Sequence, residues 1–181
     1  MSDRIAAEIY IGGMLSSRLV AGLCTTVSAQ GVSLDWGDAA FSPESAGELL
    51  AQRRKYHGEL VLALCDDQAR SGCFEPLEEF LIARRIPFDR YHEAKYEFDA
   101  ELVCYRPGKQ PTVIITDADR KPIVRFAAVA QAQQQITAVI AALEKERLAA
   151  PLRAARSVER TLAKALPSVP LLGEFNIREE A

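Results

Sequence analysis

The twin acids Asp66 and Asp67 are the residues of this 181-residue chain whose types and spacing best suit chemistry. They follow an unbroken apolar run at residues 60–65, which is typical of a central strand buried on both faces. Paired carboxylates at the end of such a strand can hold Mg²⁺ or Mn²⁺. With Arg70 and His92, they are the catalytic candidates of a metal-assisted phosphoester or nucleotide-processing enzyme.

Further polar residues would join these acids if the first three strands run parallel, because their carboxyl ends would then share one edge of the sheet. The residues gathered there would be Asp66, Asp67, Asp35, Asp38 and the candidate binding glycines Gly12 and Gly13. Glycines let a ligand approach the backbone, and the free amides of a helix start favour an anion. The glycine pair matches neither the dinucleotide fingerprint nor the phosphate loop, and twin acids after a strand often bond to loop amides instead.

Two other groups offer chemistry only under further conditions. His92 lies beside Tyr91 and Glu93 in the sequence, but proton transfer needs a nucleophile or substrate within hydrogen-bond reach of its ring. Asp117 and Asp119 have the spacing of a metal-binding pair, yet the apolar segments on both sides predict a hairpin turn. The chain carries no serine-hydrolase or zinc-protease signature.

The segment at residues 88–105 supports binding without catalysis. Its candidate contact residues are Tyr91, Glu93, Tyr96, Glu97 and Asp99. Between residues 59 and 101 there are eleven acids against five Lys or Arg, a local net charge of −6 in a chain whose net charge is −3. Tyrosine within an acidic rim is a frequent anchor for a basic protein partner. The alternative is that alternate residues of a strand here face the core while the acids are solvated.

Composition narrows the class of protein. A net charge of −3 and a pI near 5.5 argue against direct nucleic-acid binding. No apolar run approaches the roughly 20 residues of a membrane span, and the start lacks the layout of a signal peptide. The four cysteines have no paired spacing, which suits reduced thiols in the cytoplasm. We therefore expect a small intracellular interaction protein without a cofactor, with the Mg²⁺- or Mn²⁺-assisted enzyme as the alternative.

Hydrophobic patterning predicts the elements that position these residues. Strands are expected at residues 5–11, 32–36, 60–65, 96–105, 112–116 and 122–126, and helices at residues 17–30, 43–56 and 75–85. Three strand–helix steps in a row favour parallel pairing with right-handed crossovers. The predicted fold is therefore α/β, a mixed and mainly parallel sheet with flanking helices and an antiparallel hairpin. The alternative is an α+β fold whose first strands pair antiparallel.

The chain is expected to divide into three parts. Residues 1–126 would form the mixed α/β domain, and residues 127–166 a helical extension packed on it. Residues 167–181 would form a tail, either mobile or laid over a neighbour. The apolar stripes of the extension exceed what one small domain needs, so association into a homo-oligomer is a further expectation.

Overall fold

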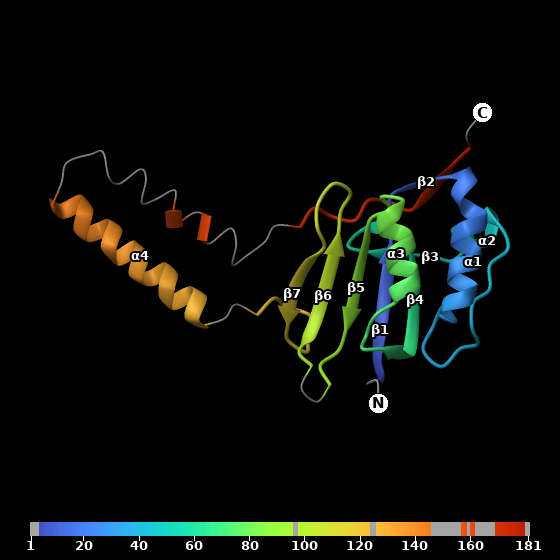
Figure 1. Cartoon of the computed structure of the whole chain (residues 1–181), viewed down its shortest axis with the longest axis horizontal. Helices are drawn as coiled ribbons and strands as arrows, with labels where there is room; N and C mark the ends of the chain where they lie inside the picture. Colours follow the sequence, from blue (N-terminus) through green and yellow to red (C-terminus); the bar gives the residue numbers. More distant parts are fainter. Residues whose placement is uncertain are drawn as a thin grey trace. The chain divides into compact units, whose positions relative to one another are not determined.

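The computed structural model describes residues 4–95, 98–123, 126–145, 157–158, 160–161 and 169–179. The chain forms two compact units, one of residues 1–121 with 170–181 and the other of residues 122–169. The second unit contains helix α4 (Phe126–Lys145). The strands and helices of the first unit are labelled in Figure 1.

A six-stranded antiparallel sheet forms the frame of the first unit. Its order is β3-β4-β1-β5-β6-β7, and every neighbouring pair runs antiparallel (Figure 1). The strands are β1 (Arg4–Ile11), β3 (Arg53–Tyr56), β4 (Glu59–Arg70), β5 (Phe88–His92), β6 (Ala100–Tyr105) and β7 (Thr112–Thr116). The prediction of a mainly parallel α/β sheet is therefore wrong.

The tight turn at His57 and Gly58 explains this difference. Both residues have positive φ, 51° and 93°, which is the geometry of a two-residue hairpin. The turn joins β3 to β4, although the sequence predicted a helix that ends at Gly58. The helix here, α2 (Ala46–Ala51), begins after Ser45 and stops before β3. Since β4 follows a hairpin, it can return antiparallel along β1.

Because β1 and β4 run antiparallel, their carboxyl ends do not share one edge of the sheet, contrary to the prediction from the sequence. Ala7 of β1 faces Asp66 of β4, and Ile11 faces Leu62. Gly12 follows the end of β1 that pairs with Leu62, whereas Asp66 pairs in the middle of β1. The two acids moreover lie within the 12-residue strand β4 and not in a loop after it. A shared edge of glycines and twin acids therefore does not form.

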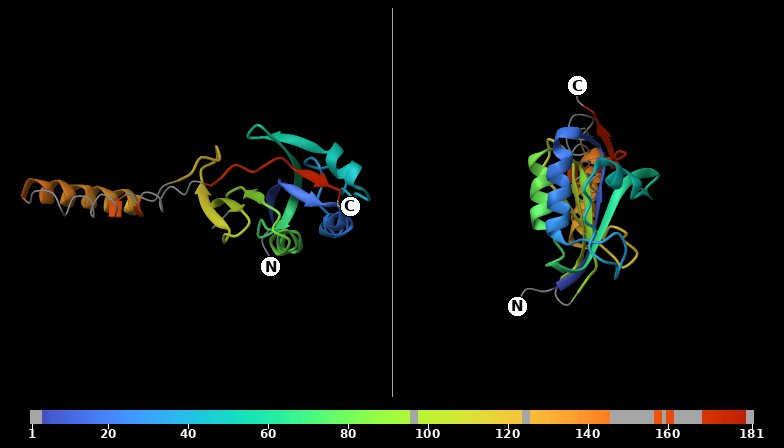
Figure 2. Two further views of the ribbon diagram at one scale, coloured as in Figure 1. Left: turned by 90° about the horizontal axis from the view of Figure 1, so that it is seen from above. Right: turned by 90° about the vertical axis from the view of Figure 1, so that its right-hand side faces the viewer.

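Two helices pack side by side on one face of the six-stranded sheet. Helices α1 (Val20–Gln30) and α3 (Glu75–Ala83) lie side by side on one face (Figure 2). The core between this face and the helices includes Ile9, Leu64 and Leu77. We call the side of the sheet turned away from α1 and α3 the open face. No helix of the described residues is both long enough and apolar enough to cross a membrane.

Residues 170–178, which we call the strap, belong to the first unit. They include β8 (Asn176–Arg178), which pairs in parallel with β2 (Met14–Ser16). The backbone of Gly13 donates to Gly173 and accepts from Asn176, both at 2.8 Å. Phe175 is fully buried in the core. The strap therefore completes the core and the edge beside the end of β1.

The predicted strands at residues 32–36 and 122–126 also differ from the structure. Ser33 makes one isolated antiparallel bridge to Cys65, and the chain then turns away. Helix α4 begins at Phe126, where the sequence predicted the end of a strand. The turn predicted at residues 117–120 does form, directly after β7. Asp117 N donates to Lys121 O at 2.9 Å, and Asp117 Oδ1 accepts from two turn amides.

Candidate functional site

The open face carries a recess between β1, β3, β4 and the loop at residues 34–36. Its volume is about 210 Å³. We call this feature the recess, and its lining residues are Glu8, Tyr10, Leu34, Asp35, Trp36, Arg54, Lys55, Tyr56, Val61, Ala63, Leu64 and Cys65. The recess thus combines an apolar floor with aromatic and charged walls.

Strand alternation produces this mixture of side chains. In β1, Ile9 and Ile11 face the helices, so Glu8 and Tyr10 face the other way. Ala63 faces Tyr10 across the β1–β4 ladder and therefore shares the open face. On β3, Arg54 lies on that face for the same reason, opposite Val61 of β4.

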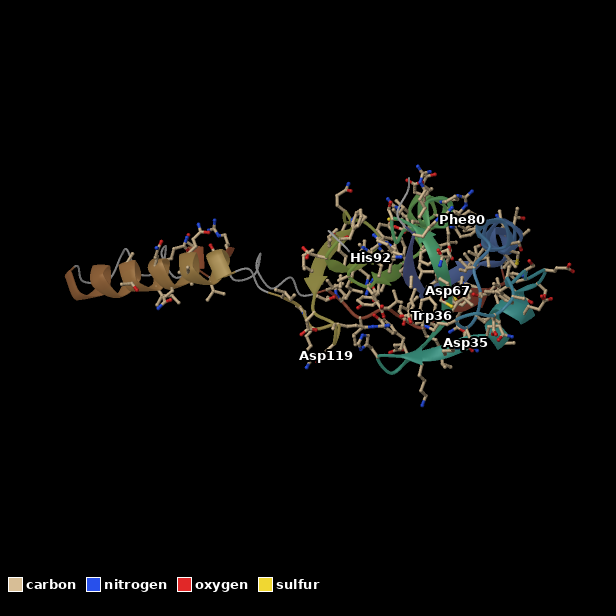
Figure 3. All side chains as sticks on the ribbon, turned by 90° about the horizontal axis from the view of Figure 1, so that it is seen from below. Asp35, Trp36, Asp67, Phe80, His92 and Asp119 are labelled. Carbon is tan, nitrogen blue, oxygen red and sulfur yellow. The ribbon has the colours of Figure 1, made fainter. Side chains whose placement is uncertain are left out.

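The loop beside the recess is fixed at several points. Ser33 exchanges backbone hydrogen bonds with Cys65 at 2.8 and 2.9 Å. Gly37 has φ of 77° and donates its amide to Asp67 Oδ2 at 3.0 Å. Trp36 lies between these anchors with 46% of its surface exposed. Figure 3 shows Asp35, Trp36 and Asp67 close together at this rim.

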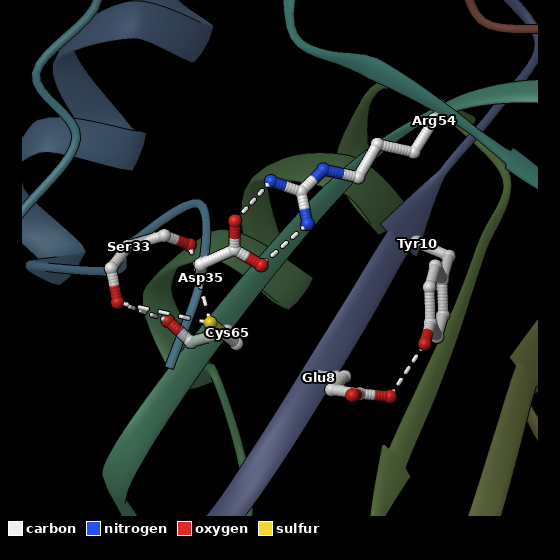
Figure 4. Close-up of polar contacts among 6 residues, drawn as sticks. All are labelled: Glu8, Tyr10, Ser33, Asp35, Arg54 and Cys65. Atoms are coloured by element: carbon white, nitrogen blue, oxygen red, sulfur yellow. Dashed lines mark hydrogen bonds and ion pairs between the residues drawn. The ribbon is translucent and has the colours of Figure 1, made fainter. Parts of the chain in front are cut away.

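An ion pair joins the loop to strand β3. Arg54 donates to both carboxylate oxygens of Asp35, at 2.7 and 2.8 Å (Figure 4). These hydrogen bonds lower the pKa of the Asp35 carboxyl below its ordinary value. Because both side chains are largely exposed, water screens the pair, and its main effect is to orient the two groups.

Two tyrosines stack on the opposite wall. The ring centroids of Tyr10 and Tyr56 are 4.0 Å apart, with an interplanar angle of 12°. Tyr10 donates its hydroxyl hydrogen to Glu8 (Figure 4). Burial and this hydrogen bond raise the pKa of Tyr10 to about 12. The pair is therefore a neutral, rigid wall at ordinary pH.

Arg120, from the turn after β7, reaches the same wall. Its Nη1 lies 2.7 Å from Glu8 Oε2 and 3.2 Å from the Tyr10 hydroxyl. Its guanidinium carbon lies 4.2 Å from the centroid of the Tyr91 ring. Burial alone would lower the pKa of Arg120, but the bonds to Glu8 and Tyr10 raise it. The guanidinium thus has a carboxylate, a phenol and an aromatic face as neighbours.

The charges around the recess do not cancel. Asp35 and Glu8 are paired with Arg54 and Arg120. Within the described part of the chain, two nearby acids, Asp38 and Asp67, have no basic side chain within ion-pair distance. Lys55 is the remaining basic residue of the lining. The rim is therefore net acidic.

The predicted catalytic residues do not assemble into a catalytic group in the described residues. Asp66 accepts from the amide of Gln68 at 2.8 Å, and Asp67 bonds to the loop as described above. Arg70 ends β4 with an exposed side chain. No hydrogen bond or ion pair joins these residues to one another, and the described residues contain no cluster of three or more metal-ligating side chains. Asp67 nevertheless belongs to the rim of the recess.

His92 lies on the helix side of the sheet, away from the recess. The ring is buried, and a Cβ at Gly72 would come within 2.6 Å of its Cγ. Nδ1 lies 3.0 Å from the carbonyl oxygen of Glu93, which can only accept, so this nitrogen carries the hydrogen. Nε2 lies 3.6 Å from a carboxylate oxygen of Glu101. These contacts describe a packed histidine that no exposed ligand reaches.

The predicted binding residues are divided between several places. Tyr91 lies buried beneath Arg120 on the open face. Glu93 and Asp99 are exposed, and Tyr96 and Glu97 lie outside the described residues. The space beside Gly12 and Gly13 holds the strap and Pro87, since a Cβ on Gly12 would approach Gly173 O to 2.2 Å. The strap and Pro87 thus fill the space beside Gly12 and Gly13 where a ligand was expected.

Several residues of the recess were not identified from the sequence. Glu8 and Tyr10 occupy the polar positions of an alternating strand. This alternation shows that they share the face turned away from the core, but it does not indicate a binding site. Arg54 and Tyr56 were assigned to a helix. Trp36 was assigned to a strand, although the flanking Asp35 and Gly37 are typical turn residues. Compared with family models, curated proteins and solved structures, the chain has no significant match.

Proposed function

We propose that this protein is an intracellular binding module whose recess receives one cationic side chain of a protein partner, without catalysis. The observation that carries the proposal is the half-exposed Trp36 beside a small recess with an acidic rim. Tryptophan is among the residues that most often dominate binding energy at protein interfaces.

The size of the recess favours a side chain over a cofactor. Its volume of about 210 Å³ lies below the roughly 300–1,000 Å³ of pockets that enclose drug-sized ligands. A nucleotide would therefore protrude into solvent. A lysine or arginine could lay its aliphatic stem on Leu34 and Val61 and keep its charged end at the rim.

The charge of the rim favours a cation. Asp38 and Asp67 carry negative charge, and no described basic side chain lies within ion-pair distance of either. The face of an exposed tryptophan attracts a cation as well, by about 0.5–1 kcal/mol. The enzyme alternative has no comparable support, because Asp66 and Asp67 bond to backbone amides. All four cysteines are unpaired thiols, in keeping with the proposed intracellular setting.

Trp36 is the single tryptophan of the chain, so tryptophan fluorescence reports on the recess alone. We would titrate the protein with capped pentapeptides of the form Gly-Gly-X-Gly-Gly, where X is Arg, Lys, Leu or Glu, and record Trp36 fluorescence. The Arg and Lys peptides should produce a saturable change that weakens with added salt. The Leu and Glu peptides should produce no saturable change.

Two variants that each remove one negative charge make the test specific. Asp67→Asn alters the rim and should weaken binding of the Arg and Lys peptides severalfold. Glu79→Gln removes the same charge from an exposed position of α3, on the other face, and should leave binding unchanged. The proposal is wrong if all four peptides change the fluorescence alike, or if the two variants weaken binding equally.

A further inference from the structure

Arg120 shows how the open face holds a guanidinium group. One carboxylate, one phenol oxygen and one aromatic ring surround this group on a single wall. Tyr91 is 4% exposed and the Glu8 side chain 16% exposed, whereas 44% of the Arg120 side chain remains in solvent. The wall is thus fixed within the sheet, and its occupant approaches it from outside.

The turn that carries Arg120 does not depend on the arginine side chain. Asp117 accepts through its backbone oxygen from Arg120 N at 3.0 Å. Its side chain accepts from the amides of Asp119 and Lys121, at 2.9 and 2.8 Å. None of these bonds involves the Arg120 side chain, so that side chain can leave the wall while the turn persists.

The wall and the recess are continuous. Glu8 and Tyr10 line the recess and also bond to Arg120. A partner chain anchored in the recess would therefore have its neighbouring residues beside the guanidinium of Arg120.

We propose that Glu8, Tyr10 and Tyr91 form a second subsite, specific for a guanidinium group, which Arg120 fills in the free protein and an arginine of the partner fills in the complex. This inference rests on the proposed function, because a partner bound in the recess would hold its own arginine next to Arg120. The partner would then present two basic residues, one for the recess and an arginine for the subsite.

The chemistry of the subsite selects arginine over lysine. A guanidinium is planar, so it can stack on the Tyr91 ring while its N–H groups bond to Glu8 and Tyr10. A lysine ammonium is compact and strongly hydrated, and it cannot make the planar stacking contact. Exchange of one arginine for another conserves every contact, which allows a partner to compete with the internal side chain.

The test removes the Arg120 side chain from the subsite and adds a small molecule that carries a guanidinium group. Arg120→Ala would be titrated with methylguanidinium chloride, with methylammonium chloride as the control for charge and salt. Nuclear magnetic resonance would follow the amides of Glu8 and Tyr10 and the ring signals of Tyr91. We expect saturable shifts with methylguanidinium only, which are lost in the double variant Arg120→Ala, Glu8→Gln. The wild type should show at least tenfold weaker binding.

Each result decides between defined alternatives. Equal shifts with both cations, or equal shifts with and without Glu8→Gln, would overturn the subsite. Should Arg120→Ala fail to fold, Arg120→Lys keeps the charge and should bind methylguanidinium more readily than the wild type. Peptide titration of Trp36 then tests the exchange, because an Arg-Gly-Arg peptide should bind Arg120→Ala more tightly than the wild type.

The two proposals fail separately in these measurements. A peptide response at Trp36 that is identical in the wild type and Arg120→Ala overturns the exchange and leaves the recess standing. A complete lack of response at Trp36 overturns the proposed function itself, even where methylguanidinium binds near Tyr91.

Discussion

Arg120 combines side-chain contacts with an unusual backbone conformation, and two substitutions separate these contributions to stability. Its φ is 62°, the left-handed region in a turn where glycine is common. Arg120→Ala keeps the unfavourable conformation and removes the contacts. Arg120→Gly removes both. The difference between the two variants therefore measures the backbone term.

The expected magnitudes follow from the three contacts. A half-exposed ion pair contributes about 0.5 kcal/mol, a hydrogen bond about 1 kcal/mol and a cation–π contact about 0.5 kcal/mol. Arg120→Ala should then lower the free energy of unfolding by about 2 kcal/mol. Glycine relieves about 1–2 kcal/mol of left-handed strain but costs about 0.5–1 kcal/mol through the more flexible unfolded chain. Arg120→Gly should thus be more stable than Arg120→Ala by about 0.5–1 kcal/mol.

Urea unfolding monitored by Trp36 fluorescence measures these differences. Since the single tryptophan belongs to the first unit, the signal reports the unfolding of that unit. Lys121→Ala, in the same turn, is the control for loss of a positive charge at an exposed side chain. If Arg120→Ala were as stable as the wild type, the contacts would contribute nothing. Equal stability of the Ala and Gly variants would refute the left-handed turn.

Three other substitutions test separate parts of the structure. The pKa of Tyr10 in the folded protein, about 12, exceeds its ordinary value of 10.0, so its contribution to stability is complete below pH 10 and declines from pH 10 to 12. Absorbance at alkaline pH should show its late ionisation, and urea unfolding of Tyr10→Phe should depend less steeply on pH in this range. Gly12→Ala should cost about 1–3 kcal/mol in urea unfolding because its Cβ meets Gly173 O, whereas Gly47→Ala, an open helical position, should stabilise by about 0.5–1 kcal/mol; equal effects would contradict the docking of the strap. Asp117→Ala should cost about 1 kcal/mol and shift the Tyr91 ring resonances, since the turn that holds Arg120 loses two hydrogen bonds; unchanged resonances would show that the turn forms without them.

Elements with strong local signals were predicted from the sequence. The apolar run at residues 60–65 lies in β4, and the helix predicted at 75–85 is α3. The turn at residues 117–120 also forms, because Asp117 bonds to backbone amides that follow it within the same segment. Each of these features depends on neighbours in sequence, which a single chain displays.

Strand direction and the recess depended on distant contacts. The sequence Arg53-Arg54-Lys55-Tyr56 has little preference for a strand, and it forms β3 because the edge of β4 offers unpaired backbone groups. Once this segment was assigned to a helix, β4 was expected to follow a crossover and to run parallel. The stack of Tyr10 on Tyr56 could not be predicted for the same reason, since it joins strands that are not neighbours in the sheet.

The buried position of Phe175 sets the order in which the protein can mature during synthesis. The sheet strands are complete once residue 116 has been made, but the core still lacks its last aromatic ring. The ribosome must add the 59 residues from 117 to 175 before that ring exists. At roughly 5–20 residues per second, this takes roughly 3–12 s. During that interval the core position of Phe175 is unfilled, so we expect a chain truncated before the strap to be less stable although it carries the whole recess.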